Sequence, residues 1–121
     1  MNFFDALNIH LAWKQRLREY VEGEGAERLD PAIVGNHHCC ELGRWIAEES
    51  EARKDSPEFA AMCEQHAAFH RCAGLVVEHM QAGDVSTARD LLLTDYAVLS
   101  ARVVKAITKL NRALESEAVA A

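Results

Sequence analysis

Apolar residues recur along this chain in alternating steps of four and three, the spacing of a helical stripe that is buried in a bundle. The first stripe predicts a helix over residues 3–22, which Gly23 and Gly25 end. Its members are Phe3, Leu7, His10, Lys14, Leu17 and Val21, with Phe4 and Leu11 widening it. A histidine therefore lies in the middle of an apolar stripe.

A connection over residues 26–35 follows, in which Asp30-Pro31 can cap and start a single helical turn. Asn36 can then cap a short second helix that runs to about Glu51. This places Cys40 in the first turn of that helix, where the positive end of the helix dipole favours a thiolate.

The third helix begins with Ser56 as its N-cap and Pro57 at its first position. Its stripe consists of Phe59, Cys63, His66, His70, Ala73, Val77 and Met80. After Gly83, Asp84 caps a fourth helix from residue 85 to about residue 114, with a possible kink near residues 93–95 and a frayed tail over residues 115–121. The stripe of this helix is drawn through Tyr96, Leu99, Val103, Ile107, Leu110 and Leu114.

These four segments predict an all-α protein, an antiparallel four-helix bundle whose short second helix carries Cys40. We expect residues 1–121 to form one domain, since there is no repeat and no low-complexity segment. The last helix has further apolar residues off its stripe, which fit either a dimer face or a well-covered monomer core: Leu91, Leu92, Leu93, Val98, Val104 and Ala106.

Composition narrows the function. The net charge of −6 disfavours a nucleic-acid surface, because no basic stripe is present to contact phosphates. No apolar run reaches the roughly 18 residues that a membrane helix needs, and the first residues do not resemble a signal peptide. We therefore expect a cytoplasmic protein without membrane insertion, whose four cysteines are thiols or metal ligands rather than disulfides.

His66 and His70 occupy two successive stripe positions where leucines would ordinarily lie. Being four residues apart, they share one face of the helix. Each buried imidazole needs a hydrogen-bond partner, and leaving one without a partner costs about 1–3 kcal/mol. A metal ion removes that cost and uses the spacing directly, with Zn–N bonds of about 2.0–2.1 Å. His10 is the natural third ligand, and Cys40 can complete a tetrahedron with a Zn–S bond of about 2.3 Å.

Three sequence stretches carry a family resemblance: His10-Leu11-Ala12-Trp13-Lys14, Cys40-Glu41-Leu42-Gly43-Arg44-Trp45, and His66-Ala67-Ala68-Phe69-His70. Their order and the Leu-Gly-Arg-Trp context resemble the bacterial chemoreceptor zinc-binding domain family over nearly the whole chain. The resemblance implies a zinc site of three histidines and one cysteine, which map onto His10, Cys40, His66 and His70. It also implies a bundle that commonly dimerises. Most members are attached to a chemoreceptor or diguanylate cyclase output, whereas this chain is expected to be a stand-alone domain.

The remaining candidate residues have weaker claims. Cys63 lies one turn before His66 and can sit beside the metal, although a small core residue needs no special role. Cys39 can pair with Cys40 only through a strained bridge, and Cys72 is expected to fill the core. Trp13 and Trp45 are expected to pack and to shield the site from water. His37, His38 and His79 are expected at helix ends or on the surface.

Three other functions compete. A haemerythrin-like di-iron bundle would need more histidines, but His79 lies about 14 Å beyond His70 along the helix, and the last helix has no histidine. A zinc hydrolase would need an open coordination position and a general base, and no His-Glu-x-x-His pattern is present. A purely structural zinc-stabilised adaptor would use the same four ligands.

The hypothesis from the sequence is a non-enzymatic, zinc-binding sensory module of bacterial signal transduction. Zinc would join the first, second and third helices. Loss of the ion, or oxidation of Cys40, would release the short second helix. The resemblance suggests zinc availability or an oxidant such as hypochlorous acid as the stimulus, a homodimer as the working form, and a chemoreceptor or diguanylate cyclase as the partner.

Overall fold

The computed structural model describes residues 2–23 and 28–120, without the side chains of Cys39 and of residues 118–120. The predicted helix end at Gly25 and the start of the connection at residue 26 lie outside the described residues. Every regular element in the described part is helical: α1 (Phe3–Glu22), α2 (Pro31–Val34), the 3₁₀ turn η1 (His37–Cys39), α3 (Glu41–Glu49), α4 (Pro57–Gln81), α5 (Val85–Leu93) and α6 (Asp95–Ala120). The all-α prediction is confirmed.

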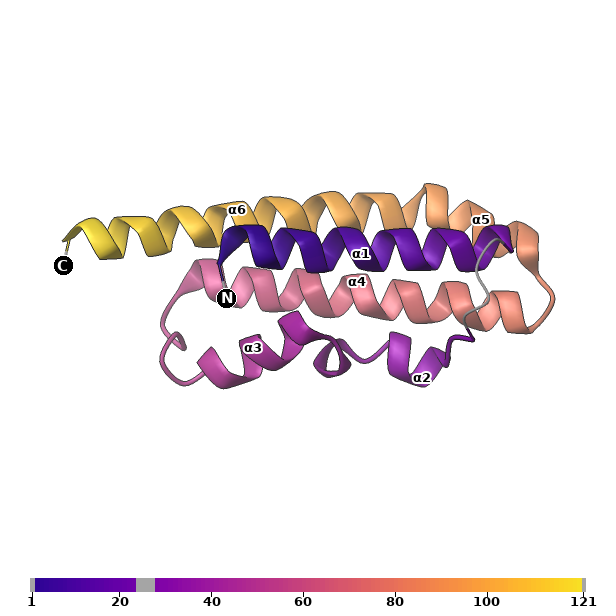
Figure 1. Cartoon of the computed structure of the whole chain (residues 1–121), viewed down its shortest axis with the longest axis horizontal. Helices are drawn as coiled ribbons and strands as arrows, with labels where there is room; N and C mark the ends of the chain where they lie inside the picture. Colours follow the sequence, from indigo (N-terminus) through magenta and orange to yellow (C-terminus); the bar gives the residue numbers. More distant parts are fainter. Residues whose placement is uncertain (1, 24–27, 121) are drawn as a thin grey trace.

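Three long helices, α1, α4 and α6, lie along the length of the molecule (Figure 1). Both α1 and α4 contact α6, while α2, η1 and α3 follow one another along α4. The C-terminal part of α6 runs beyond the ends of α1 and α4 (Figure 1). No helix in the described ranges combines the length and the apolar character needed to cross a bilayer.

Most helix starts follow local capping. A capping box between Asn2 and Asp5 begins α1, the Ser56 side chain accepts from the Phe59 N–H at the start of α4, and Asp84 caps α5. α1 has the predicted bounds and ends at Gly23, whose φ of 74° suits glycine. The predicted widening of its stripe is wrong, because Phe4 and Leu11 are exposed.

The predicted continuous second helix is wrong. The segment is divided into η1 and α3, because Cys40 between them has an extended backbone (φ −99°, ψ 161°). Before it, the predicted turn at Pro31 forms α2, which approaches α4 closely where Gly35 meets Gly74. A Cβ on Gly74 would lie 2.9 Å from the Cα of Gly35, so this contact is made by backbone.

The predicted fourth helix is two helices. They are separated at Thr94, whose φ of −112° and ψ of −91° are not helical. The break lies where a kink was expected, but α6 continues to Ala120 instead of fraying after Leu114. The buried stripe of α6 also differs from the predicted one, since Ser100 is fully buried and Leu99 only partly.

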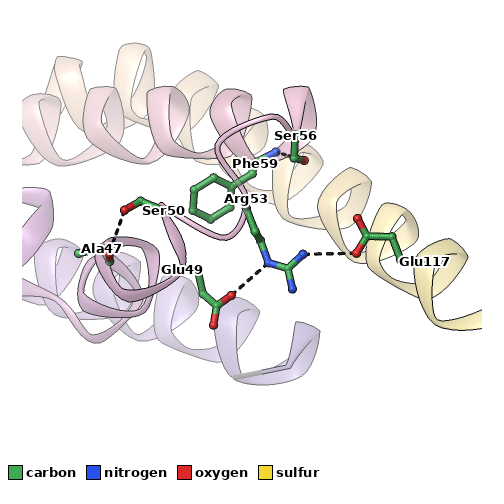
Figure 2. A network of polar contacts seen from close by, with 7 residues as sticks. All are labelled: Ala47, Glu49, Ser50, Arg53, Ser56, Phe59 and Glu117. Atoms are coloured by element: carbon green, nitrogen blue, oxygen red, sulfur yellow. Dashed lines mark hydrogen bonds and ion pairs between the residues drawn. The ribbon is translucent and has the colours of Figure 1, made fainter. Parts of the chain in front are cut away.

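Arg53, in the loop between α3 and α4, joins the end of α3 to the C-terminal part of α6. Its guanidinium contacts Glu49 in the last turn of α3 at 3.2 Å and Glu117 near the end of α6 at 3.4 Å (Figure 2). Ser50 and Ser56 make local hydrogen bonds on either side of it. Ion pairs of this partly exposed kind stabilise a fold by at most about 1 kcal/mol. They position the loop after α3, but they contribute less to the stability of the fold than the packing of the buried core does.

Candidate metal centre

Three side chains of metal-binding type meet in the interior. Cys40 Sγ and one ring nitrogen each of His66 and His70 lie within 4.8 Å of one another, and all three residues are buried. Cys40 Sγ is 3.2 Å from His66 Nε2. Two ligands of one tetrahedral zinc ion are separated by roughly 3.3–3.6 Å, given bonds of about 2.0–2.3 Å. The donors are therefore spaced for a single ion.

Cys40 is placed by the junction between η1 and α3. It is the N-cap of α3, and its Sγ accepts a hydrogen bond from the Gly43 N–H at 3.2 Å. A Cβ on Gly43 would overlap the carbonyl oxygen of His37, so this position requires glycine. Burial raises the pKa of the Cys40 thiol, and the N–H groups of Gly43 and Leu42 partly oppose that rise by stabilising the thiolate.

His70 has a fixed tautomer. Its Nδ1 donates a hydrogen bond to the carbonyl of Val34 at 2.8 Å, so Nε2 carries the lone pair. A second hydrogen bond of this kind orients metal-binding histidines in general. Burial lowers the pKa of His70, with the Val34 bond opposing the shift. His70 is thus held neutral, in the form that binds a metal.

His66 lies one turn earlier on the same face of α4. Its Nε2 faces Cys40, and its Nδ1 is buried without a hydrogen-bond partner. Burial, and then the neighbouring His70, lower the pKa of His66 to about 3. A neutral imidazole with Nε2 directed at a thiol is in the form that binds a metal, whereas the unsatisfied Nδ1 makes His66 a costly core residue.

His10, the remaining predicted ligand, is buried on α1 but lies outside this group of three. Its Nε2 is 2.8 Å from Ser100 Oγ on α6, and its ring packs 4.6 Å from that of Phe69. Burial, then Lys14 and His70, lower the pKa of His10 to about 4. The structure thus brings three of the four predicted ligands together and places the fourth nearby, against Ser100.

Aromatic rings surround the group. The Trp13 indole lies edge-on to the His70 imidazole, with centroids 5.4 Å apart, and the Arg16 guanidinium covers the indole at 4.3 Å. The His37 ring lies 6.0 Å from that of His66. Trp45 packs instead against Phe59. Trp13 therefore has the position for shielding the site from water.

The other candidates lie elsewhere. Cys63 is half-buried on α4 and Cys72 is buried, and neither belongs to the group. The side chain of Cys39 lies outside the described residues. His79, which a di-iron site would need, contacts Asp84 at 3.5 Å at the end of α4. Over the described part of the chain, the one cluster of metal-type donors contains no carboxylate.

Sequence reasoning missed two partners of the histidines. The Val34 carbonyl orients His70, and a backbone acceptor gives no sequence signal. Ser100 contacts His10, and its signal was available: the series 96, 100, 103, 107, 110 has the same four–three spacing as the series through Leu99. A polar residue in a buried register indicates a partner.

The sequence profile of one protein family, described as the chemoreceptor zinc-binding domain, matches residues 10–77. The matched range begins at His10 and contains Cys40, His66 and His70. It covers more than half of the 121 residues. Comparison with curated proteins and with solved structures found no match. The cluster of Cys40, His66 and His70 is able to bind zinc, the ion that the description of this family names.

Proposed function

This chain belongs to the chemoreceptor zinc-binding domain family, and we propose that it is a non-catalytic zinc-binding sensory module of bacterial signal transduction. The observation that carries the proposal is the buried convergence of the Cys40 thiol with two imidazole nitrogens within 4.8 Å. The proposed ligands are His10, Cys40, His66 and His70. Zinc bound by four protein ligands has no open position for substrate, so binding and sensing are favoured over hydrolysis.

We propose that residues 1–121 act as one domain of four-helix type. In this description α2, η1 and α3 together take the place of the second helix, and α5 with α6 take the place of the fourth. Contacts of α6 with both α1 and α4 support including the chain beyond residue 77. The single hydrogen bond between His10 and Ser100 also joins the matched range to α6.

Cys40 is the proposed point of switching. It comes from the nine-residue α3 and the turn before it, whereas His66 and His70 are fixed on the 25-residue α4. A two-electron oxidant such as hypochlorous acid would transfer oxygen to the thiolate, giving a sulfenic acid and chloride. The oxidised sulfur is a poorer ligand, so α3 would be released from α4. Falling zinc availability would have the same effect, and a reducing cytoplasm would keep the thiol ready.

A homodimer that reports to a chemoreceptor or a diguanylate cyclase is the proposed assembly. The family description supports the chemoreceptor. Some of the apolar residues off the predicted stripe belong to the core: Ala106 is buried, and Leu91 and Leu92 are partly buried against the core. Leu93 and Val98 remain exposed at 76% and 51%. These two are available for a second copy of the chain.

The test is metal analysis of the purified protein together with zinc affinity by chelator competition. We expect one zinc per chain, and Cys40→Ala should weaken zinc binding by at least about a hundredfold. Cys72→Ala and Cys63→Ala are the matched controls and should leave the affinity near that of the wild type. Two irons per chain would support the haemerythrin-like alternative, and equal affinity in all three variants would remove Cys40 from the site.

His10→Ala tests the fourth ligand separately. Weaker zinc binding is expected if His10 completes the tetrahedron, and unchanged affinity would leave a three-residue site. A purely structural zinc differs from a sensing one in exchange. We expect hypochlorous acid to release zinc from the wild type, and retention of zinc after oxidation of Cys40 would favour the structural adaptor.

A further inference from the structure

Ser100 is a buried polar residue in the stripe of α6 that faces the core, with 2% of its surface exposed. Its Oγ lies 2.8 Å from His10 Nε2. The two residues are 90 positions apart, so this hydrogen bond joins α1 to α6 in the interior. A buried hydroxyl at a core position is costly unless it is paired, and His10 provides the pairing.

The same hydrogen bond holds the His10 ring against Ser100, outside the group of metal-type donors. No ring nitrogen of His10 belongs to the group formed by Cys40, His66 and His70. A neutral imidazole nitrogen carries either one hydrogen or one lone pair in the ring plane. His10 Nε2 therefore cannot bond Ser100 and ligate a metal at the same time.

We propose that Ser100 is a positioning residue that holds His10 away from the metal centre, and that His10 exchanges Ser100 for zinc when the ion is bound. The inference rests on the proposed role of His10 as a ligand. The exchange breaks a direct contact between α1 and α6 when zinc enters. It thereby extends the effect of zinc from α3 and α4 to α6, the helix that projects beyond the rest of the bundle (Figure 1).

This competition fixes the sign of a mutational effect. The bond to Ser100 stabilises only the zinc-free state, so removing the hydroxyl destabilises that state. In the zinc-bound state the same substitution removes a buried hydroxyl that has lost its partner, so that state is not destabilised. Zinc affinity must then rise. Typical net values for one buried hydrogen bond correspond to an increase of about threefold to tenfold.

The experiment compares Ser100→Ala with the wild type in two measurements. One is the zinc dissociation constant from chelator competition, and the other is denaturant unfolding of the zinc-free and zinc-loaded proteins. We expect tighter zinc binding, with the loss of stability confined to the zinc-free form. Ser100→Thr retains the hydroxyl and should restore the wild-type affinity. Thr108→Ala is the matched control, because the Thr108 hydroxyl on the same helix bonds its own backbone at Val104 and should leave affinity unchanged.

Each other outcome overturns the proposal. Equal destabilisation of both forms would make Ser100 a packing residue only. Weaker zinc binding in Ser100→Ala would mean that Ser100 supports His10 while it ligates. His10→Ala, measured alongside, separates this inference from the proposed function: weaker binding there with unchanged affinity in Ser100→Ala would contradict the exchange and leave the ligand role intact.

Discussion

At the scale of single residues, His66 is an energetically unfavourable member of the core. It is 2% exposed, faces a thiol with one nitrogen and has no partner for the other. Its pKa is lowered from 6.5 to about 3, chiefly by burial. In the zinc-free protein this residue opposes folding, both through the unsatisfied Nδ1 and through the proton that it cannot accept.

His66→Leu is therefore expected to make the zinc-free protein more stable than the wild type, and increasingly so as the pH falls. Unfolded wild-type protein binds a proton at His66 near pH 6.5, whereas the folded protein binds it only near pH 3. This histidine therefore costs no proton-linked stability above pH 6.5, and the wild type loses stability as the pH falls from 6.5 toward 3. The variant lacks this loss, which amounts to at most about 1.4 kcal/mol per pH unit. Urea unfolding with a chelator at pH 8, 6.5 and 5 measures it.

The value at pH 8 is the internal control, because the histidine is then neutral in both states and only packing and the unsatisfied nitrogen contribute. A stability difference that stays constant from pH 8 to pH 5 would show that His66 titrates alike in folded and unfolded protein. A variant that binds zinc as well as the wild type would remove His66 from the proposed ligand set.

The residue scale also shows where sequence reasoning succeeds. His66 and His70 were found because two imidazoles interrupt a regular apolar stripe, and the structure buries both. Ser100 was missed because the neighbouring Leu99 offered an equally regular stripe with an apolar residue. The acceptor for His70 is the Val34 carbonyl, and tertiary packing alone brings that backbone oxygen within reach.

At the scale of elements, the junction between η1 and α3 is the feature that places the Cys40 thiol beside His66 and His70. An uninterrupted helix would leave the sulfur in a helical turn, whereas the extended backbone of Cys40 makes it the N-cap of α3. The junction is held by the close approach of Gly43 to the His37 carbonyl. Capping residues such as Ser56 and Asp84 allowed other helix starts to be predicted. This break depends on a contact between two backbones, which the sequence does not display.

Gly43→Ala should consequently separate helix stability from site geometry. Alanine has a higher helix propensity than glycine by about 1 kcal/mol, so the substitution favours formation of α3 itself. The new methyl group must displace the His37 carbonyl, which shifts η1 and moves Cys40. We expect zinc affinity to fall by at least about tenfold while the zinc-free protein keeps its helical circular dichroism.

Gly83→Ala is the control for general destabilisation. Gly83 has a φ of 81°, so alanine is strained there, but a Cβ would meet no atom within 4 Å and the metal centre is not touched. This variant should be less stable and keep its zinc affinity. If Gly43→Ala binds zinc as tightly as Gly83→Ala does, the junction does not position the thiol.

At the scale of the whole molecule, exposed apolar residues gather where α1 meets the α5–α6 corner. Leu11 from α1 and Leu93 from α5 line one groove, which also includes Lys14, Arg18 and Tyr96. Val98 lies one turn into α6 and is also exposed. The proposed exchange of His10 between Ser100 and zinc acts on these same two helices, α1 and α6. A dimer formed through this corner would therefore receive the signal directly.

Leu93→Glu tests this assembly. Sedimentation of the wild type is expected to show a dimer at micromolar concentration. A glutamate at this position would place a charge in the interface, raising the dimer dissociation constant by at least about tenfold. Zinc should still bind at one ion per chain, because Leu93 is not among the proposed ligands. Leu75→Glu is the matched control: Leu75 is a leucine on α4 exposed at 48%, away from the groove, and its variant should dimerise as the wild type does. If the Leu75 variant dissociates and the Leu93 variant does not, the dimer forms through α4. The exchange of His10 between Ser100 and zinc would then not act on the dimer interface.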